Sequence, residues 1–253
     1  MRSNLGQIRT LGSVFADPQG RTTILRAALA FKNMQPAECP CCGYTGKFAP
    51  AGLSARLGQK CPGCEAYERH RLIAIALQRD FLSVTGKDVI HFAPERSVSS
   101  MLLKQRPRSY VTADVTPGVA DRTLDIEKLD LPDSCFDVAF VSHVLEHVDD
   151  RTALSELRRI LRSDGELVAL VPLVEGWDST YENPSITDPE ERTVHFGRPD
   201  HLRIYGADFR KLLHDAGFCL AEFTAGPVDS PKFKLERGEK IFLGKKAANE
   251  VVL

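Results

Sequence analysis

The sequence predicts an α/β protein with a mostly parallel sheet, preceded by a small cysteine-rich unit. From residue 88 onward, short apolar runs alternate with amphipathic stretches, as in strands that helices cover on both faces. Five of the seven cysteines lie within Cys39–Cys64. Residues 1–72 carry ten Lys and Arg against four Asp and Glu, whereas residues 73–253 carry 23 against 30. We therefore expect two units, 1–72 and 73–253.

The overall composition is that of a globular protein. The chain has 253 residues, of which 43% are hydrophobic and 26% charged, with a formal net charge of −1. These values argue against a disordered or fibrous protein. No apolar run approaches the roughly 18 residues of a membrane span, and residues 1–20 lack the apolar core of a secretory signal. The expected location is the cytoplasm.

Two C-x-x-C pairs, Cys39/Cys42 and Cys61/Cys64, are separated by 18 residues. This spacing is typical of a zinc site with four thiolate ligands and no open position for water. Disulfides would require an oxidising compartment, and a redox motif would normally occur once. We expect these four cysteines to bind a structural Zn²⁺ in a small ribbon, with Cys41 as a spare thiol.

The remaining elements follow in order along the chain. Residues 68–82 have helical periodicity and join the ribbon to the main domain. Strands are expected at 88–94, 109–115, 136–145 and 165–174, and helices at 98–106, 151–165 and 206–218. Two final strands, 218–225 and 240–246, lack an intervening helix and should form an antiparallel hairpin. Ligands of such sheets bind at the carboxyl ends of the strands.

Residues 130–172, DLPDSCFDVAFVSHVLEHVDDRTALSELRRILRSDGELVALVP, resemble the class I S-adenosylmethionine-dependent methyltransferases, in particular the type 11-like branch with an LEHV motif after the fourth strand. HFAPE, VHFGRPDHLRIYG and the four-cysteine ribbon resemble a bacterial subgroup of these enzymes. The resemblance implies a Rossmann-like seven-stranded sheet in the order 3-2-1-4-5-7-6. It also implies S-adenosylmethionine as the cofactor.

The resemblance further implies a set of cofactor-binding residues. Asp114 would bind the ribose hydroxyls, and Asp125 with Ile126 the adenine. Phe92, Ala93 and Glu95, in the turn after the first strand, would approach the methionine part of the cofactor. Ser142, at the end of the fourth strand, would lie beside the sulfonium. The first turn, HFAPERS, contains no glycine, which disfavours a dinucleotide pyrophosphate but suits a cofactor without phosphate.

Histidines mark the expected acceptor side. His143 is the first candidate for a general base, because its pKa lies near the working pH, and His201 is the second. His143, Glu146 and His147 are similar to the E-x-x-E-H divalent-metal site of some small-RNA and ubiquinone-pathway O-methyltransferases, with His143 replacing the first Glu. Alternatively, Glu146 and His147 only cap and pack the turn.

The polar segment at about 175–205 is expected to form a lid over the acceptor. Its Arg192, Arg198 and Arg203 would either bind an anionic acceptor or be solvated surface charges. The leading hypothesis is methyl transfer to an O or N atom of a small molecule or glycan intermediate. One alternative is an RNA methyltransferase that binds RNA through the basic ribbon. Another is a non-catalytic zinc-ribbon adaptor with a degenerate methyltransferase fold.

Overall fold

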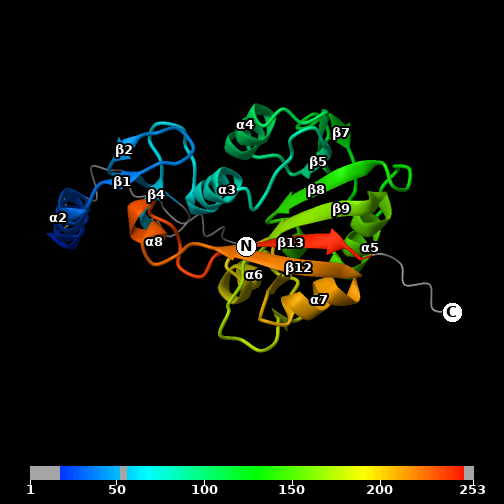
Figure 1. Cartoon of the computed structure of the whole chain (residues 1–253). Coiled ribbons are helices and arrows are strands. Elements are labelled where there is room, and N and C mark those ends of the chain that lie inside the picture. The colour runs from blue at the N-terminus through cyan, green and yellow to red at the C-terminus, as the bar shows by residue number, and fades with distance from the viewer. Residues whose placement is uncertain (1–17, 52–55, 248–253) are drawn as a thin grey trace.

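The computed structural model describes residues 18–51 and 56–247 (Figure 1). The sequence also predicts an N-terminal helical segment within residues 1–72; α2 (Pro18–Asn33) is the first helix described, and residues 1–17 lie outside the described part. Two short hairpins follow and form the ribbon. Their strands are β1 (Ala37–Glu38), β2 (Thr45–Gly46), β3 (Ala49–Ala51) and β4 (Arg56–Lys60).

The main domain contains a seven-stranded sheet in the order β12-β13-β9-β8-β5-β6-β7. When β5 is numbered as the first strand and the sheet is read from β7 to β12, the order is 3-2-1-4-5-7-6, which confirms the expected topology. β13 pairs antiparallel with both β9 and β12, so the final hairpin is also confirmed. The strands are β5 (Asp88–Phe92), β6 (Ser109–Asp114), β7 (Arg122–Thr123), β8 (Phe136–Ser142), β9 (Leu161–Leu170), β12 (Phe218–Thr224) and β13 (Lys240–Lys246).

The sheet is covered on both faces because its central strands are apolar on both sides. Along β8, Val138 and Phe140 pack in the core formed with α3 and α4. Ala139 and Val141 face the opposite core, which α5 and α7 complete. This alternation is the period of two expected for a strand. The helices are α3 (Glu68–Gln78), α4 (Arg96–Lys104), α5 (Asp150–Ile160), α7 (Phe209–Asp215) and the short α8 (Asp229–Lys232).

Helix α3 joins the ribbon to the sheet and runs without a break across residue 72, the expected boundary between the two units. Arg71 is fully buried. Its guanidinium donates to the carbonyl oxygens of Gln59 and Ala66 in the ribbon and of Phe233 and Lys234 after α8, at 2.6–2.9 Å. One buried cation thus connects the ribbon, α3 and the segment that leads into β13.

The expected lid contains regular structure: the hairpin of β10 (Tyr181–Glu182) and β11 (Arg203–Ile204), and α6 (Pro189–Phe196). Asp188 caps α6 by accepting from the backbone N–H groups of Glu190 and Glu191, and Pro189 occupies the first turn. Gly197, with φ of 82°, ends the helix. Throughout the described ranges, every helix is too short or too polar to cross a membrane.

Candidate functional site

The end of β8 brings several buried polar atoms together. Ser142 is the last residue of the strand, and His143 follows in the left-handed region with φ of 56°. His143 Nδ1 lies 3.1 Å from Oε1 of Glu146, whose side chain is fully buried. Ser142 Oγ, His143 Nε2 and Glu146 Oε2 are buried and have no hydrogen-bond partner among the residues described. Buried polar atoms are nearly always hydrogen-bonded, so their concentration here indicates a ligand site.

The turn after β5 has the backbone shape that glycine usually provides. Phe92 is buried, and Ala93 has φ of 47° while its N–H donates to the carbonyl of Ala113 at 2.8 Å. An alanine in this region costs roughly 1–2 kcal/mol relative to right-handed backbone. The missing glycine therefore leaves the tight turn intact, and a methyl group replaces the hydrogen at its apex.

Glu95 caps this turn as part of an ionic cluster. Its carboxylate binds the guanidinium of Arg69, and His70 Nε2 lies 2.9 Å from Oε2. Burial raises the pKa of Glu95, but the hydrogen bonds from His70 and Arg69 outweigh it and lower the pKa to about 2. Glu95 is therefore a carboxylate that is already paired within the protein, with Arg69 and His70.

The three residues expected to bind the nucleoside lie at the end of β6 and just after β7. Asp114 ends β6, and its Oδ1 accepts from the N–H of Thr116 at 2.7 Å. Asp125 Oδ1 similarly accepts from the N–H of Glu127 at 3.0 Å. Ile126 is buried in the same core as Phe92. In both Asp114 and Asp125, one carboxylate oxygen is thus held by a backbone N–H group.

The candidate divalent-metal group differs from the expected one. Ligand atoms of Glu146, His147 and His201 lie within 4.8 Å of one another, and His143 is not part of this group. His147 Nδ1 lies 3.1 Å from the backbone carbonyl oxygen of Asp200. His201 Nδ1 lies 3.1 Å from that of Phe196. Such bonds leave Nε2 as the ligand atom, as in many metal sites. The fold replaces His143 with His201, because the lid lies against the LEHV turn and His143 is occupied with Glu146.

The four expected zinc ligands do come together. The Sγ atoms of Cys39 and Cys64 are 3.6 Å apart, and those of Cys42 and Cys61 are 3.7 Å apart. Thiolates at 2.3 Å from one zinc ion would be about 3.8 Å apart in a tetrahedron. Cys41 points elsewhere, with Sγ 3.6 Å from the carbonyl of His70.

The two cysteine pairs are supported by matching turns. Gly43 N donates to the carbonyl of Cys39, and Glu65 N to that of Cys61, both at 2.8 Å. The ribbon core is small, with Ala37, Phe48 and Ala66 around the buried cysteines. A unit with so few apolar residues would be stabilised by a metal bound to its four cysteines.

The lid arginines are already paired within the protein. Arg203 donates to the carbonyls of Leu145 and Val148 and to Glu182. Arg198 pairs with Asp200, and Arg192 donates to the carbonyl of Ile186. Arg203 is buried and has a structural role. The described contacts thus do not support the hypothesis that these arginines bind an anionic acceptor.

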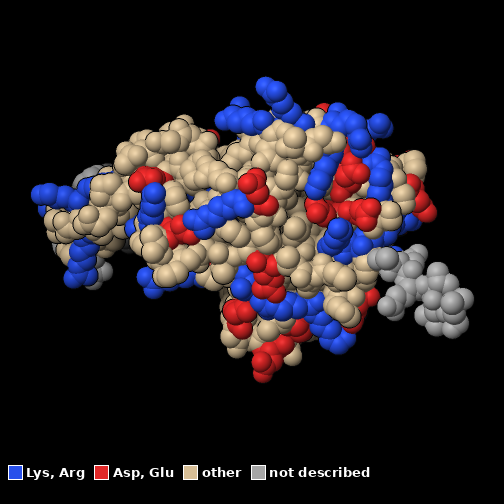
Figure 2. Space-filling view, in the orientation of Figure 1, with Lys and Arg blue, Asp and Glu red and all other residues tan. Residues whose placement is uncertain are grey.

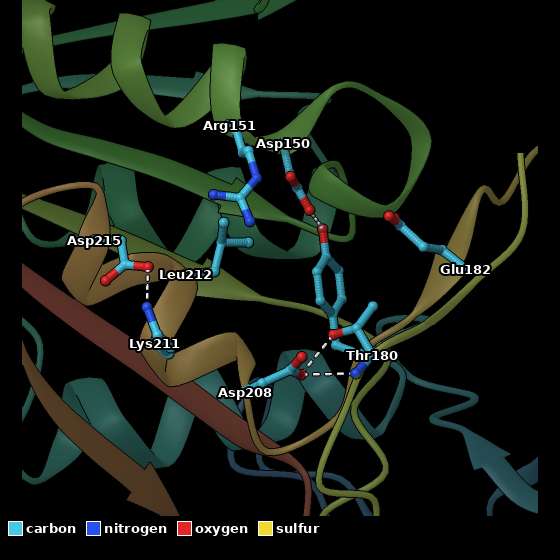
Figure 3. Close-up of a pocket in the computed structure, with 9 residues that line it drawn as sticks. Asp150, Arg151, Thr180, Glu182, Asp208, Lys211, Leu212 and Asp215 are labelled. Atoms are coloured by element: carbon cyan, nitrogen blue, oxygen red, sulfur yellow. Dashed lines mark hydrogen bonds and ion pairs between the residues drawn. The ribbon is translucent and has the colours of Figure 1, made fainter.

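A cavity of about 280 Å³ lies between α5, α7 and the lid (Figure 3). The Tyr205 hydroxyl donates to Asp150 at 2.8 Å, and Asp208 accepts from both the N–H and the hydroxyl of Thr180. Burial raises the pKa of Asp150, while the charge of Arg203 opposes this. These polar groups bind one another across the cavity and attach the lid to the helices.

A second cavity, of about 320 Å³, lies beside His143 at the carboxyl ends of β8 and β9. Its wall includes Leu173, Ile204 and Glu239, the residue before β13. Glu239 Oε2 is buried and has no hydrogen-bond partner in the described part of the chain. Burial raises the pKa of Glu239 to about 7, against the opposing charge of His143. No sequence motif marks Glu239, which lies in the charged stretch LERGEK.

Residues 76–169 match the family model described as a methyltransferase domain. This part of the chain is therefore similar to a methyltransferase domain. The match runs from the end of α3 to β9 and includes the strand ends described above. It agrees with the resemblance in the sequence.

Known proteins similar to this methyltransferase domain are distant. A 37.1 kDa protein of transposon TN4556 from Streptomyces fradiae is 35% identical over 117 residues, which are 45% of this chain and 32% of that protein. The match thus spans about a third of that relative's length.

One similar solved structure is a complex of the Haloferax volcanii Trm112 methyltransferase activator with a protein assigned as a methyltransferase. The matching chain of that complex has a TM-score of 0.51 and is 15% identical. The match covers 71% of this chain and 90% of that chain. The 1,6-didemethyltoxoflavin-N1-methyltransferase of Burkholderia thailandensis has a TM-score of 0.47 and is 17% identical. That match covers 70% of this chain and 76% of the Burkholderia chain. The first of these shows that the fold is shared.

Proposed function

We propose that this protein transfers a methyl group from S-adenosylmethionine to an O or N atom of a small molecule or glycan intermediate. The observation that carries the proposal is the group of buried polar atoms without partners at the end of β8, within the matched methyltransferase domain. The proposal includes a structural Zn²⁺ held by Cys39, Cys42, Cys61 and Cys64.

The residues around the strand ends suit this cofactor. Asp114 would accept hydrogen bonds from the ribose hydroxyls, and Asp125 and Ile126 would contact the adenine. Phe92, Ala93 and the cluster at Glu95 would hold the methionine part, with Ser142 near the sulfonium. The cofactor itself supplies an activated methyl group, so the protein contributes chiefly position and orientation.

His143 is the proposed base. Its Nδ1 binds Glu146, so the ring is oriented, and the unpartnered Nε2 would be the atom that accepts the proton. This arrangement follows the general pattern of a base that a carboxylate orients. His201, the second candidate, is better placed with Glu146 and His147. These three would hold a divalent cation, which would polarise an acceptor oxygen or nitrogen.

Cofactor binding is tested with S-adenosylhomocysteine by calorimetry. Wild type should bind, and Asp114→Ala should bind about tenfold or more weakly, because the ribose hydroxyls lose a charged acceptor. Asp121→Ala is the matched control, since its carboxylate is already occupied by hydrogen bonds from the N–H and hydroxyl of Thr112. Failure of wild type to bind the cofactor product would refute the proposal.

RNA is the second candidate acceptor, and the charge of α2 favours it. This helix carries Arg21, Arg26 and Lys32, all exposed, and no acidic residue. Figure 2 shows Lys and Arg side chains at this end of the molecule. Phosphate contacts would make binding fall steeply with salt. Absence of RNA binding at low salt would exclude this acceptor.

A further inference from the structure

Glu239 is an unusual group for the wall of a methyl-acceptor cavity. It shares that wall with His143, and both side chains contain a buried polar atom that lacks a partner among the described residues. An ionised carboxylate in such a position is costly unless a donor or a cation reaches it. The protein supplies neither at Oε2, so the incoming molecule is the natural source.

The charges that act on Glu239 come from three segments. They belong to His143 at the end of β8, to Glu236 on its own segment, and to Glu68 and Arg69 on α3. Arg69 is engaged by Glu95, and Arg237 also lines the cavity. Charges of both signs therefore surround Glu239, and its unpartnered Oε2 is the group that an incoming cation would neutralise.

The other carboxylates of this cavity are already paired. Glu236 forms two hydrogen bonds with Arg56, at 2.9 and 3.0 Å. Glu175 accepts from Arg210 at 2.8 Å. Glu239 is the carboxylate of the cavity wall that has no ion pair within the described ranges.

We propose that Glu239 determines acceptor specificity by binding an ammonium group, and that the acceptor is therefore an amine. This inference rests on the proposed function and narrows its acceptor class. The bound ammonium passes one proton to His143 Nε2, and its lone pair attacks the methyl carbon. The S–CH₃ bond breaks with its electrons moving to sulfur, which gives S-adenosylhomocysteine and the methylated amine.

The test uses sinefungin, a cofactor analogue with a primary amine in place of the methylsulfonium. Its affinity relative to S-adenosylhomocysteine measures how strongly the cavity attracts an ammonium at the transfer position. Calorimetry of both ligands is carried out on the full chain for wild type, Glu239→Gln and Glu236→Gln. The control removes a carboxylate of the same segment that Arg56 already neutralises.

We expect wild type to bind sinefungin more tightly than S-adenosylhomocysteine. In Glu239→Gln the ratio of the two affinities should fall about tenfold, as for the loss of a hydrogen bond to a charged group. Glu236→Gln should retain it. An unchanged preference in Glu239→Gln, with normal binding of S-adenosylhomocysteine, would overturn this inference and leave the proposed function standing. If S-adenosylhomocysteine fails to bind wild type, the proposed function itself fails.

Discussion

Replacing Glu239 with Gln should stabilise the protein at alkaline pH and leave its stability nearly unchanged at acidic pH. The pKa of Glu239 rises from 4.5 to about 7 in the folded protein, chiefly through burial. In the unfolded chain the carboxyl ionises near 4.5. The unfolding free energy of wild type therefore falls as the pH rises between these two values, because the unfolded state has already lost the proton that the folded state retains.

The size of the effect follows from the two pKa values. Each factor of ten in proton affinity corresponds to about 1.4 kcal/mol, so the difference between 4.5 and about 7 amounts to about 3 kcal/mol. Gln is neutral at every pH and has nearly the same shape as the protonated acid. Glu239→Gln should then exceed wild type by up to about 3 kcal/mol at pH 8, and by much less at pH 5.

The assay is unfolding of wild type, Glu239→Gln and Glu236→Gln at pH 5 and pH 8. For a chain of this size the gain at pH 8 corresponds to a rise in Tm of about 6–12 °C. His91, whose pKa burial lowers to about 4, also titrates between its folded and unfolded values in this range, but it is present in all three proteins and cancels in the comparison. An equal difference between variant and wild type at both pH values would refute the reasoning.

Three further predictions concern the metal sites and the buried arginine. Cys61→Ser should reduce the zinc content well below one ion per chain by atomic emission, whereas Cys41→Ser should retain it, because that thiol contacts the carbonyl of His70 instead. Arg71→Met should lower the unfolding free energy by about 3 kcal/mol or more in denaturant titrations, since four carbonyls, two of them in buried hydrogen bonds, lose their donor; a loss below 1 kcal/mol would contradict the structure. Zinc-loaded wild type should bind one Mn²⁺ by spin-resonance titration and His201→Ala none, and equal binding by both would exclude the cluster.

Much of the fold could be predicted because its signals are local. The apolar run from Phe136 to Ser142 is buried on both faces in the structure, as a central parallel strand must be. The paired C-x-x-C turns also fix their own geometry, since Gly43 and Glu65 close equivalent hydrogen bonds. In both cases a few neighbouring residues determine the result.

The candidate site was predictable only in part, because it depends on contacts between distant segments. Arg71 has the appearance of a surface residue in ERHR, yet it is fully buried. His201 joins Glu146 only because the lid lies against the LEHV turn, where Leu202 N donates to the carbonyl of Glu146 at 2.9 Å. Glu239 reaches His143 because β13 inserts between β9 and β12. No spacing rule relates residues 96 positions apart.

These long-range contacts also give the ribbon a role in the acceptor site. Arg71 donates to the carbonyls of Phe233 and Lys234 and also to those of Gln59 and Ala66 in the ribbon. This anchor lies on the segment that leads to Glu239. The ribbon therefore fixes the backbone that presents Glu239 to the cavity, and a carboxylate held in this way need not be ordered again when an acceptor binds. The ribbon is therefore part of the proposed acceptor site, although its four clustered cysteines do not line the cavity.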